Sequence, residues 1–202
     1  MILSGPEIIR QVELGRIRID PFDAKRVNPA SFDLTLGDQV AVYANAIKGD
    51  GDIPCSGWDL IPSLDGARLD TAKDERVLRY QIPSSGWLVK PGIGYLMHTV
   101  ERVWTDRYVP IIDGKSSVGR MFVKIHETAG FGDPGFDGQY TLEVTAVHPV
   151  ILYPGMRIAQ IRFHAIEGEL ALYDGNYKNE TARGPVPSRV WSQIQSDGLV
   201  KK

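Results

Sequence analysis

The stretch DGKSSVGRMFVKIHETAGFGDPGFDGQYTLE, residues 113–143, is the most informative part of this chain. It holds, in order, a basic and hydroxyl-rich turn, an apolar strand, a glycine-rich loop around one aspartate, and an alternating strand that ends on a carboxylate. Such residues bind phosphate groups and carry protons in enzymes. We therefore expect this stretch to bind a phosphorylated small molecule, and the rest of the chain to position it.

The turn Gly114–Arg120, GKSSVGR, combines two hydroxyls, a lysine, an arginine and two glycines. Small residues let backbone N–H groups approach phosphate oxygens, and the cations supply charge and hydrogen bonds. The spacing differs from that of a P-loop, because the Gly-x-x-x-x-Gly-Lys pattern is absent. The same composition also fits a surface turn that opens a helix with Ser116 as its N-cap. Composition alone leaves both interpretations open.

The loop 128–138, TAGFGDPGFDG, predicts a tight connection between two strands. Its glycines permit positive φ, and Asp133 is held near extended geometry by Pro134. An exposed backbone here could read the edge of a base while Asp133 binds a sugar hydroxyl. A hairpin loop with an Asx-turn is the more common alternative.

Residues 139–147 alternate with the period of a β-strand. One face is apolar and consists of Tyr140, Leu142, Val144 and Ala146; the other is polar and consists of Gln139, Thr141, Glu143 and Thr145. Glu143 therefore shares a face with hydroxyls, as a general base in a cleft would. An exposed glutamate on a strand is the ordinary alternative.

Length and composition describe an ordinary globular chain. Its 202 residues predict a single domain, 1–202, and its net charge of −2 gives no nucleic-acid footprint. No apolar run approaches the about 20 residues that span a membrane, and the first residues lack the features of a signal peptide. The single cysteine, Cys55, rules out an internal disulfide framework and fits a reducing compartment. We expect a cytoplasmic protein that contacts neither membrane nor nucleic acid.

The pattern along the chain predicts a mainly β fold with a short N-terminal helix. That helix would start after Ser4 and end at Gly15. Many short apolar runs follow, separated by glycine and proline, with a long polar excursion over 48–73. The tail 168–202 is polar and is either disordered or an arm that orders as a lid against a ligand or a neighbouring subunit.

The histidines show no spacing typical of metal ligands. They are His98, His126, His148 and His164. With one cysteine in the chain, the pattern His-x-Glu followed by Pro-Cys-x-x-Cys of zinc deaminases is missing. We expect no zinc site, and we interpret His126 as structural.

Taken together, these motifs resemble the dCTP deaminase family, the zinc-independent branch of the trimeric dUTPase-like superfamily. The matching segments cover most of the chain: Asn28–Gly37, Gly114–Arg120, Thr128–Phe136, Leu142–Glu143, Tyr153–Ile158 with Gln160, and Gly184–Arg189. The resemblance implies a distorted β-barrel of the β-clip type that forms a homotrimer, with active sites at the subunit interfaces.

The resemblance also implies roles for particular residues. Glu143 would activate water for attack on C4 of cytosine, while Ser116 and Arg120 orient that water and stabilise the adduct. Asp133 would hold the deoxyribose 3′-hydroxyl. Further substrate contacts are implied for Lys115, Ser117, the backbone near Ala129, Gln160, Tyr173 and Lys178. Magnesium would arrive with the triphosphate, no zinc would be used, and dTTP is the inhibitor expected of the family.

Three positions depart from the family pattern. Lys115 stands where the family usually has arginine, which keeps the charge but loses the forked hydrogen bonds. In the tail, Asn179 and Ala182 interrupt the usual Lys-Tyr-x-x-Gln. The deamination centre is intact, so the departures affect the phosphate contacts and the lid.

The leading hypothesis is a dCTP deaminase, and three further questions stay open. The small residue after Ala129 resembles members that also hydrolyse dUTP to dUMP, so the enzyme could be bifunctional. A monofunctional dUTP diphosphatase is disfavoured because its glycine-rich C-terminal arm is absent. A nucleotide-binding regulator without turnover is disfavoured by the intact set of Ser116, Arg120 and Glu143.

Overall fold

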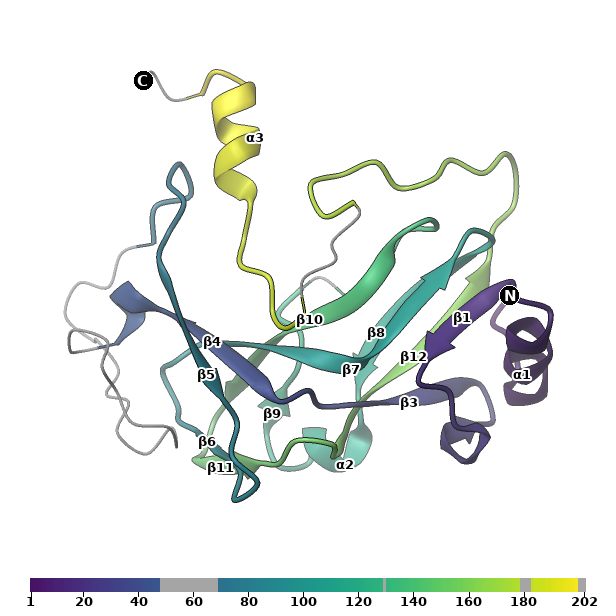
Figure 1. The fold of residues 1–202 in the computed structure, drawn as a ribbon, viewed down its shortest axis with the longest axis horizontal. Helices are drawn as coiled ribbons and strands as arrows, with labels where there is room; N and C mark the ends of the chain where they lie inside the picture. The colour runs from purple at the N-terminus through teal and green to yellow at the C-terminus, as the bar shows by residue number, and fades with distance from the viewer. Residues whose placement is uncertain (48–68, 129, 179–182, 200–202) are drawn as a thin grey trace.

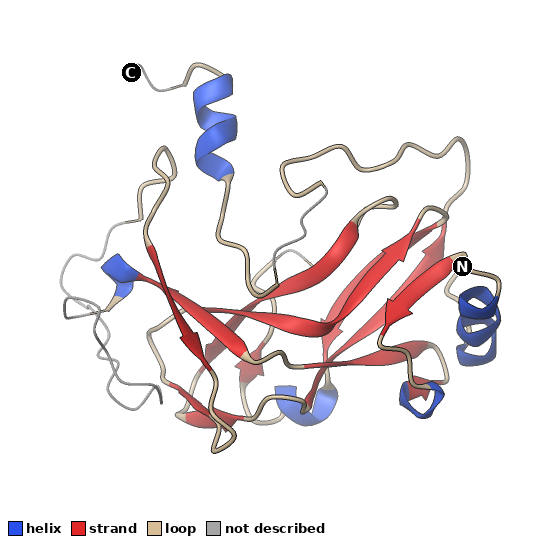
Figure 2. Ribbon diagram, in the orientation of Figure 1, coloured by secondary structure: helices blue, strands red, loops and turns tan. Residues whose placement is uncertain are grey.

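The computed structural model describes residues 1–47, 69–128, 130–178 and 183–199. Antiparallel strands form the body, α1 lies at one edge, and α3 projects near the C-terminus (Figure 1; Figure 2). The helices are α1 (Gly5–Glu13), α2 (Ser116–Gly119) and α3 (Val190–Ser196), with 3₁₀ turns at Ala24–Arg26 and Ala44–Ala46. The expectation of a mainly β fold with a short N-terminal helix is confirmed. Barrel closure and trimer formation stay predictions.

The strands of the described residues form three antiparallel sheets. The largest has the order β5-β4-β7-β10-β9, with β1 also paired to β7; its strands are β1 (Ile17–Asp20), β4 (Gln39–Tyr43), β5 (Val77–Gln81), β7 (Tyr95–Thr105), β9 (Val123–Lys124) and β10 (Asp137–Ala146). The second has the order β2-β3-β12-β8, with β2 (Val27–Asn28), β3 (Ser31–Thr35), β8 (Tyr108–Gly114) and β12 (Arg157–Ala165). The third pairs β6 (Trp87–Val89) with β11 (Val150–Leu152).

Local sequence explains the helix at the start of the chain. The Ser4 hydroxyl accepts a hydrogen bond from the Glu7 N–H at 3.4 Å, which caps the first turn. Gly15, with φ of 67°, follows the last turn in a conformation that favours glycine. Ile8 is fully buried and packs α1 onto the body. The start and end predicted from the sequence are both confirmed.

The large sheet and the β3–β12 pair share one hydrophobic core. Its fully buried members include Phe32 and Leu34 on β3, Ile161 and Phe163 on β12, and Leu142 and Val144 on β10. The buried Leu142 and Val144 confirm the apolar face predicted for 139–147. The opposite face of β10 is therefore available for polar contacts, and the candidate site lies there.

One helix was not predicted, and the start of another was misplaced. α3 was missed, because the sequence showed only the early helix clearly. α2 begins at Ser116 with Lys115 at the N-cap position and no side-chain cap bond, so the interpretation of Ser116 as the N-cap is wrong by one residue. Most of the excursion 48–73 lies outside the described residues, and its described end, 69–73, contains no strand.

Candidate active site

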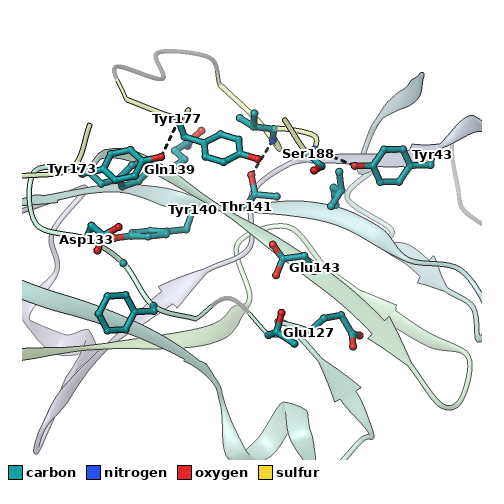
Figure 3. Close-up of a pocket in the computed structure, with 16 residues that line it drawn as sticks. Tyr43, Glu127, Asp133, Gln139, Tyr140, Thr141, Glu143, Tyr173, Tyr177 and Ser188 are labelled. Atoms are coloured by element: carbon teal, nitrogen blue, oxygen red, sulfur yellow. Dashed lines mark hydrogen bonds between the residues drawn. The ribbon is translucent and has the colours of Figure 1, made fainter. Parts of the chain in front are cut away.

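A cavity of about 540 Å³ lies over the polar face of β10, between the loop that follows β9 and the C-terminal arm (Figure 3). We use the term arm for the described residues 168–178 and 183–189. The residues around the cavity are mostly aromatic or acidic: Tyr43, Leu96, Glu127, Thr128, Phe131, Gly132, Asp133, Phe136, Gln139, Tyr140, Thr141, Glu143, Tyr173, Tyr177, Val186 and Ser188. Its size and aromatic walls suit a small planar ligand.

Glu143 has a histidine partner at the floor of the cavity. Its Oε2 lies 2.8 Å from Nδ1 of His126, and the carboxylate remains about one-third exposed. The His126 side chain is only 11% exposed. Its other ring nitrogen, Nε2, is buried without a hydrogen-bond partner in the described part of the chain. A carboxylate held on one side and open to the cavity on the other is arranged as a general base.

Glu127 is a second glutamate at the same end of the cavity (Figure 3). The Thr145 hydroxyl donates to its Oε1 at 2.7 Å, and this hydrogen bond lowers the pKa of Glu127, with a smaller contribution from Lys124. Because the Glu127 carboxylate is committed to Thr145, Glu143 is the better placed of the two to exchange protons with a ligand.

The loop with Asp133 forms the other end of the cavity. It is fixed to β8 by hydrogen bonds from Ile112 N–H to Gly130 O (2.7 Å) and from Gly132 N–H to Pro110 O (2.8 Å). A β-carbon on Gly130 would collide with the carbonyl oxygen of Ile112, so this close approach requires glycine. Asp133 itself is exposed at the cavity mouth, where a ligand hydroxyl could reach it.

Aromatic rings line the wall beside Asp133. Phe136 packs on Tyr140 with ring centroids 5.1 Å apart and meets Tyr173 edge to face at 6.0 Å. Burial raises the pKa of Tyr140, and the Asp133 charge adds to the rise, so the Tyr140 phenol stays neutral. Tyr140 was predicted for the apolar face. The register between β10 and β7 shifts between Gln139 and Thr141, and the Tyr140 ring reaches the cavity.

The arm covers the cavity through main-chain donors. The N–H of Val186 donates to the Thr141 hydroxyl at 2.9 Å, and the N–H of Ser188 donates to the Tyr43 hydroxyl at 3.1 Å (Figure 3). The N–H of Gly184 donates to the Gln139 side chain at 3.2 Å. Tyr173 is anchored to the loop by its own N–H, 2.7 Å from Pro134 O. The arm is thus ordered against the polar face of β10.

The hydroxyl-rich turn lies outside the cavity. Ser116, Ser117 and Arg120 are exposed, and none of them lines the cavity. Val118 is buried and fixes the short helix α2 to the body. The described residues around the cavity include no lysine or arginine, although Glu127, Asp133 and Glu143 are there. The structure therefore brings Glu143, Asp133 and Tyr173 together and leaves the turn apart from them.

The remaining predicted contacts also lie outside the cavity. Lys115 Nζ binds Asp33, and Lys178 Nζ binds Asp174 at 2.6 Å. Gln160 lies on β12 opposite Asp33, with its Oε1 3.5 Å from the Ser31 hydroxyl. Ala129, Asn179 and Ala182 fall outside the described residues.

Sequence reasoning missed several cavity residues. His126, interpreted only as structural, contacts Glu143 across 17 positions. Tyr43 comes from β4 and Tyr177 from the arm, and no local pattern connects either with Glu143. The one usable signal was the position of His126 and Glu127 within the informative stretch itself.

A mainly β body with a cavity floored by a histidine-supported carboxylate is typical of an enzyme that acts on a small planar molecule. The model of the dCTP deaminase-like family matches residues 2–166. The chain belongs to the dCTP deaminase-like family, and the resemblance inferred from the motifs is confirmed.

The curated relatives match along nearly the whole chain. A protein of Clostridium beijerinckii named "dCTP deaminase, dUMP-forming" is 40% identical over 196 residues, which is 96% of this chain and 99% of the relative. Proteins with the same name from Hathewaya histolytica and Leptospira biflexa are 39% and 36% identical, each over 96% of this chain.

One solved structure supports the fold. A 2′-deoxycytidine 5′-triphosphate deaminase from Agrobacterium tumefaciens aligns with a TM-score of 0.56 at 21% identity. The alignment covers 81% of this chain, and this chain spans 47% of that one.

Proposed function

We propose that this protein deaminates dCTP to dUTP and ammonia without zinc, and that it then hydrolyses dUTP to dUMP and pyrophosphate. The observation that carries the proposal is the Glu143 carboxylate, held by His126 and open to an aromatic cavity. The shared name of the relatives, dUMP-forming dCTP deaminase, supports the second step. The two steps would supply dUMP in pyrimidine deoxynucleotide metabolism.

The chemistry follows from the position of Glu143. Its carboxylate accepts a proton from water as the water oxygen bonds to C4 of cytosine. The electron pair of the C4–N3 double bond moves onto N3 as the water adds. The proton is then returned to the departing amino group, the exocyclic C4–N bond breaks and ammonia leaves, and the remaining hydroxyl proton passes to N3, so that a C4 carbonyl remains. His126 keeps the Glu143 carboxylate turned toward the cytosine ring during both proton transfers. Asp133 at the cavity mouth is placed to accept a hydrogen bond from the sugar hydroxyl.

Binding of the substrate phosphates requires residues from a second subunit. A triphosphate carries several negative charges, whereas the described cavity residues contribute three carboxylates and no cation. Ser116, Ser117 and Arg120 are exposed away from this cavity and have the chemistry that phosphates require. A homotrimer in which the turn of one subunit faces the cavity of the next supplies both halves. Three equivalent sites would result, and dTTP would compete for them.

Magnesium would enter with the nucleotide. No group of three or more histidine, cysteine, aspartate or glutamate side chains capable of holding a metal occurs in the described residues. This arrangement fits magnesium, which keeps several waters and binds through substrate phosphates. When bound, the ion neutralises phosphate charge, and the roles of Glu143, His126 and Asp133 do not depend on contact with it.

The test is a single incubation with dCTP and magnesium, with ammonia, pyrophosphate and the nucleotide product measured together. Ammonia, pyrophosphate and dUMP in equal amounts are expected. Ammonia with dUTP alone would leave a deaminase without the second step. Hydrolysis of dUTP without any turnover of dCTP would overturn the deaminase assignment in favour of a diphosphatase, and binding without turnover would indicate a regulator.

No helix in the described part of the chain is both long enough and apolar enough to cross a membrane.

A further inference from the structure

Two motifs 82 positions apart meet at one buried carboxylate. Asp33, on β3, is 1% exposed, and both of its oxygens lie 2.8 Å from Nζ of Lys115. Asn28 donates to the same carboxylate at 2.8 Å. A buried carboxylate is tolerated only when it is paired and hydrogen-bonded. The charge of Lys115 is therefore committed to Asp33.

A second cation, Arg157, lies beside the same carboxylate but is held loosely. Its Nη1 is 3.4 Å from Asp33, and its side chain is 54% exposed. The guanidinium group has five N–H donors, and this single long contact leaves most of them available. Asp33 and Lys115 cancel in charge, so the remaining positive charge of this cluster sits on Arg157, at the surface.

Strand pairing places Arg157 next to the hydroxyl-rich turn. On β8 and β12, Gly114 pairs with Ala159, and the N–H of Lys115 donates to Ile158 O at 3.3 Å. Arg157 begins β12, two residues before Ala159, and its side chain contacts the same carboxylate, Asp33, as Lys115, the residue that directly precedes α2. The exposed hydroxyls of the turn and the exposed guanidinium thus lie at the same edge of the sheet.

We infer that Arg157 binds the substrate phosphates in this chain and that Lys115 is a positioning residue that fixes the turn to Asp33. The inference deepens the proposed function and rests on it. Two of the three N–H donors of Lys115 are directed at Asp33, which leaves one donor, and its charge is already neutralised, whereas a phosphate is bound best by an uncommitted cation with several donors. An arginine next to it provides the forked donors that the turn lacks at position 115.

The variant Arg157→Gln tests whether Arg157 binds the substrate phosphates. Binding of inorganic triphosphate with magnesium is measured by calorimetry on the full chain, together with KM and kcat for dCTP. A phosphate-binding arginine predicts Kd and KM values raised about tenfold with kcat unchanged, and an unchanged Kd for deoxycytidine. Arg107→Gln is the matched control, because Arg107 is 53% exposed and also lies beside an aspartate. Unchanged triphosphate binding in Arg157→Gln would overturn the inference.

The double variant Lys115→Met with Asp33→Leu tests whether Lys115 only positions the turn. It removes both charges together, so that no unpaired buried carboxylate is left to unfold the protein. A positioning role predicts that kcat falls and that triphosphate Kd rises clearly less than in Arg157→Gln, since Lys115 fixes the turn but itself contributes no phosphate contact. A tenfold loss of triphosphate binding here would make Lys115 the phosphate ligand and refute the assignment.

The proposed function and the inference about Arg157 can fail separately. A parent protein that binds triphosphate through Arg157 but never releases ammonia from dCTP contradicts the proposed function alone. A parent that deaminates dCTP, with normal triphosphate binding in Arg157→Gln, contradicts only the inference about Arg157.

Discussion

The Nδ1 atom of His126 lies 2.8 Å from Oε2 of Glu143, and the ring is almost fully buried behind the carboxylate. No other hydrogen-bonding group among the described residues contacts the second ring nitrogen. The polar contact of this imidazole is therefore directed at Glu143. A histidine packed this way fixes the direction of a carboxylate without competing with it for substrate.

Replacing His126 separates this orienting role from packing. His126→Ala should lower kcat for deamination by about 10- to 100-fold with little change in KM, because a misaligned base affects the transition state more than binding. His126→Asn should recover much of the rate, because its side-chain amide can place a donor near the position of Nδ1. Steady-state kinetics with dCTP decide the matter, and normal kcat in the alanine variant would refute the role.

Glu143→Gln should abolish ammonia release while dCTP binding stays within a few-fold of the parent. The amide keeps the shape of the side chain but no longer accepts the proton of water. Glu127→Gln is the control, because Glu127 lines the same cavity but is occupied by Thr145. If Glu143→Gln deaminates at the normal rate, or Glu127→Gln is the dead variant, the base has been misassigned.

Co-expression of two inactive variants tests whether each site is shared between subunits. Ser116→Ala lacks one hydroxyl group of the turn, and Glu143→Gln lacks the carboxylate that acts as the general base. Random mixing of the two in a trimer leaves about one quarter of sites with both groups intact, if each site combines a turn and a cavity from different subunits. Activity near that fraction in co-purified protein is expected. No recovery in confirmed mixed assemblies would place both groups in one subunit.

Thr141→Val should loosen the arm. The substitution keeps the shape but removes the oxygen that accepts the Val186 N–H. KM for dCTP should rise several-fold with a smaller effect on kcat, as expected when a hydrogen bond that holds a covering segment is lost. Thr141→Ser retains the hydroxyl and serves as the control. Equal KM values for the valine and serine variants would show that this bond does not hold the arm.

Stability should fall as the solution becomes acidic, and His98 should account for part of the fall. Burial lowers the pKa of His98 below its ordinary value of 6.5, because the charged ring loses hydration. Between the lowered folded value and 6.5 the unfolded chain binds more protons, so the free energy of unfolding rises with pH through that interval and levels off above it.

Urea denaturation between pH 5 and 8 measures this dependence. His98→Gln should show a shallower slope than the parent. A parent whose stability does not change across this range would contradict the assignment.

The elements that the sequence predicted well are those with a strong local pattern. The period of two over 139–147 placed Leu142 and Val144 in the core and Glu143 on the opposite face, as the structure confirms. Ser4 and Gly15 bounded α1 correctly, since capping depends only on neighbouring residues. The family itself was also identified from motif order, which the comparisons confirm.

Contacts between distant segments could not be predicted in the same way. The His126–Glu143 and Lys115–Asp33 pairs depend on how strands align across sheets, and no local periodicity reports that alignment. The register shift beside Tyr140 has no marker in the sequence either. The resemblance implied that Ser116 and Arg120 act with Glu143 at subunit interfaces, and within one chain the cavity contains none of the turn residues.

The arm is attached to the body by its own main chain. The N–H groups of Gly184, Val186 and Ser188 are the donors, and side chains of β4 and β10 are the acceptors. Every residue except proline carries such an N–H group. The attachment therefore depends on the course of the main chain over β10, and loss of an acceptor at Tyr43, Gln139 or Thr141 weakens it more directly than a change of side chain at Val186 or Ser188.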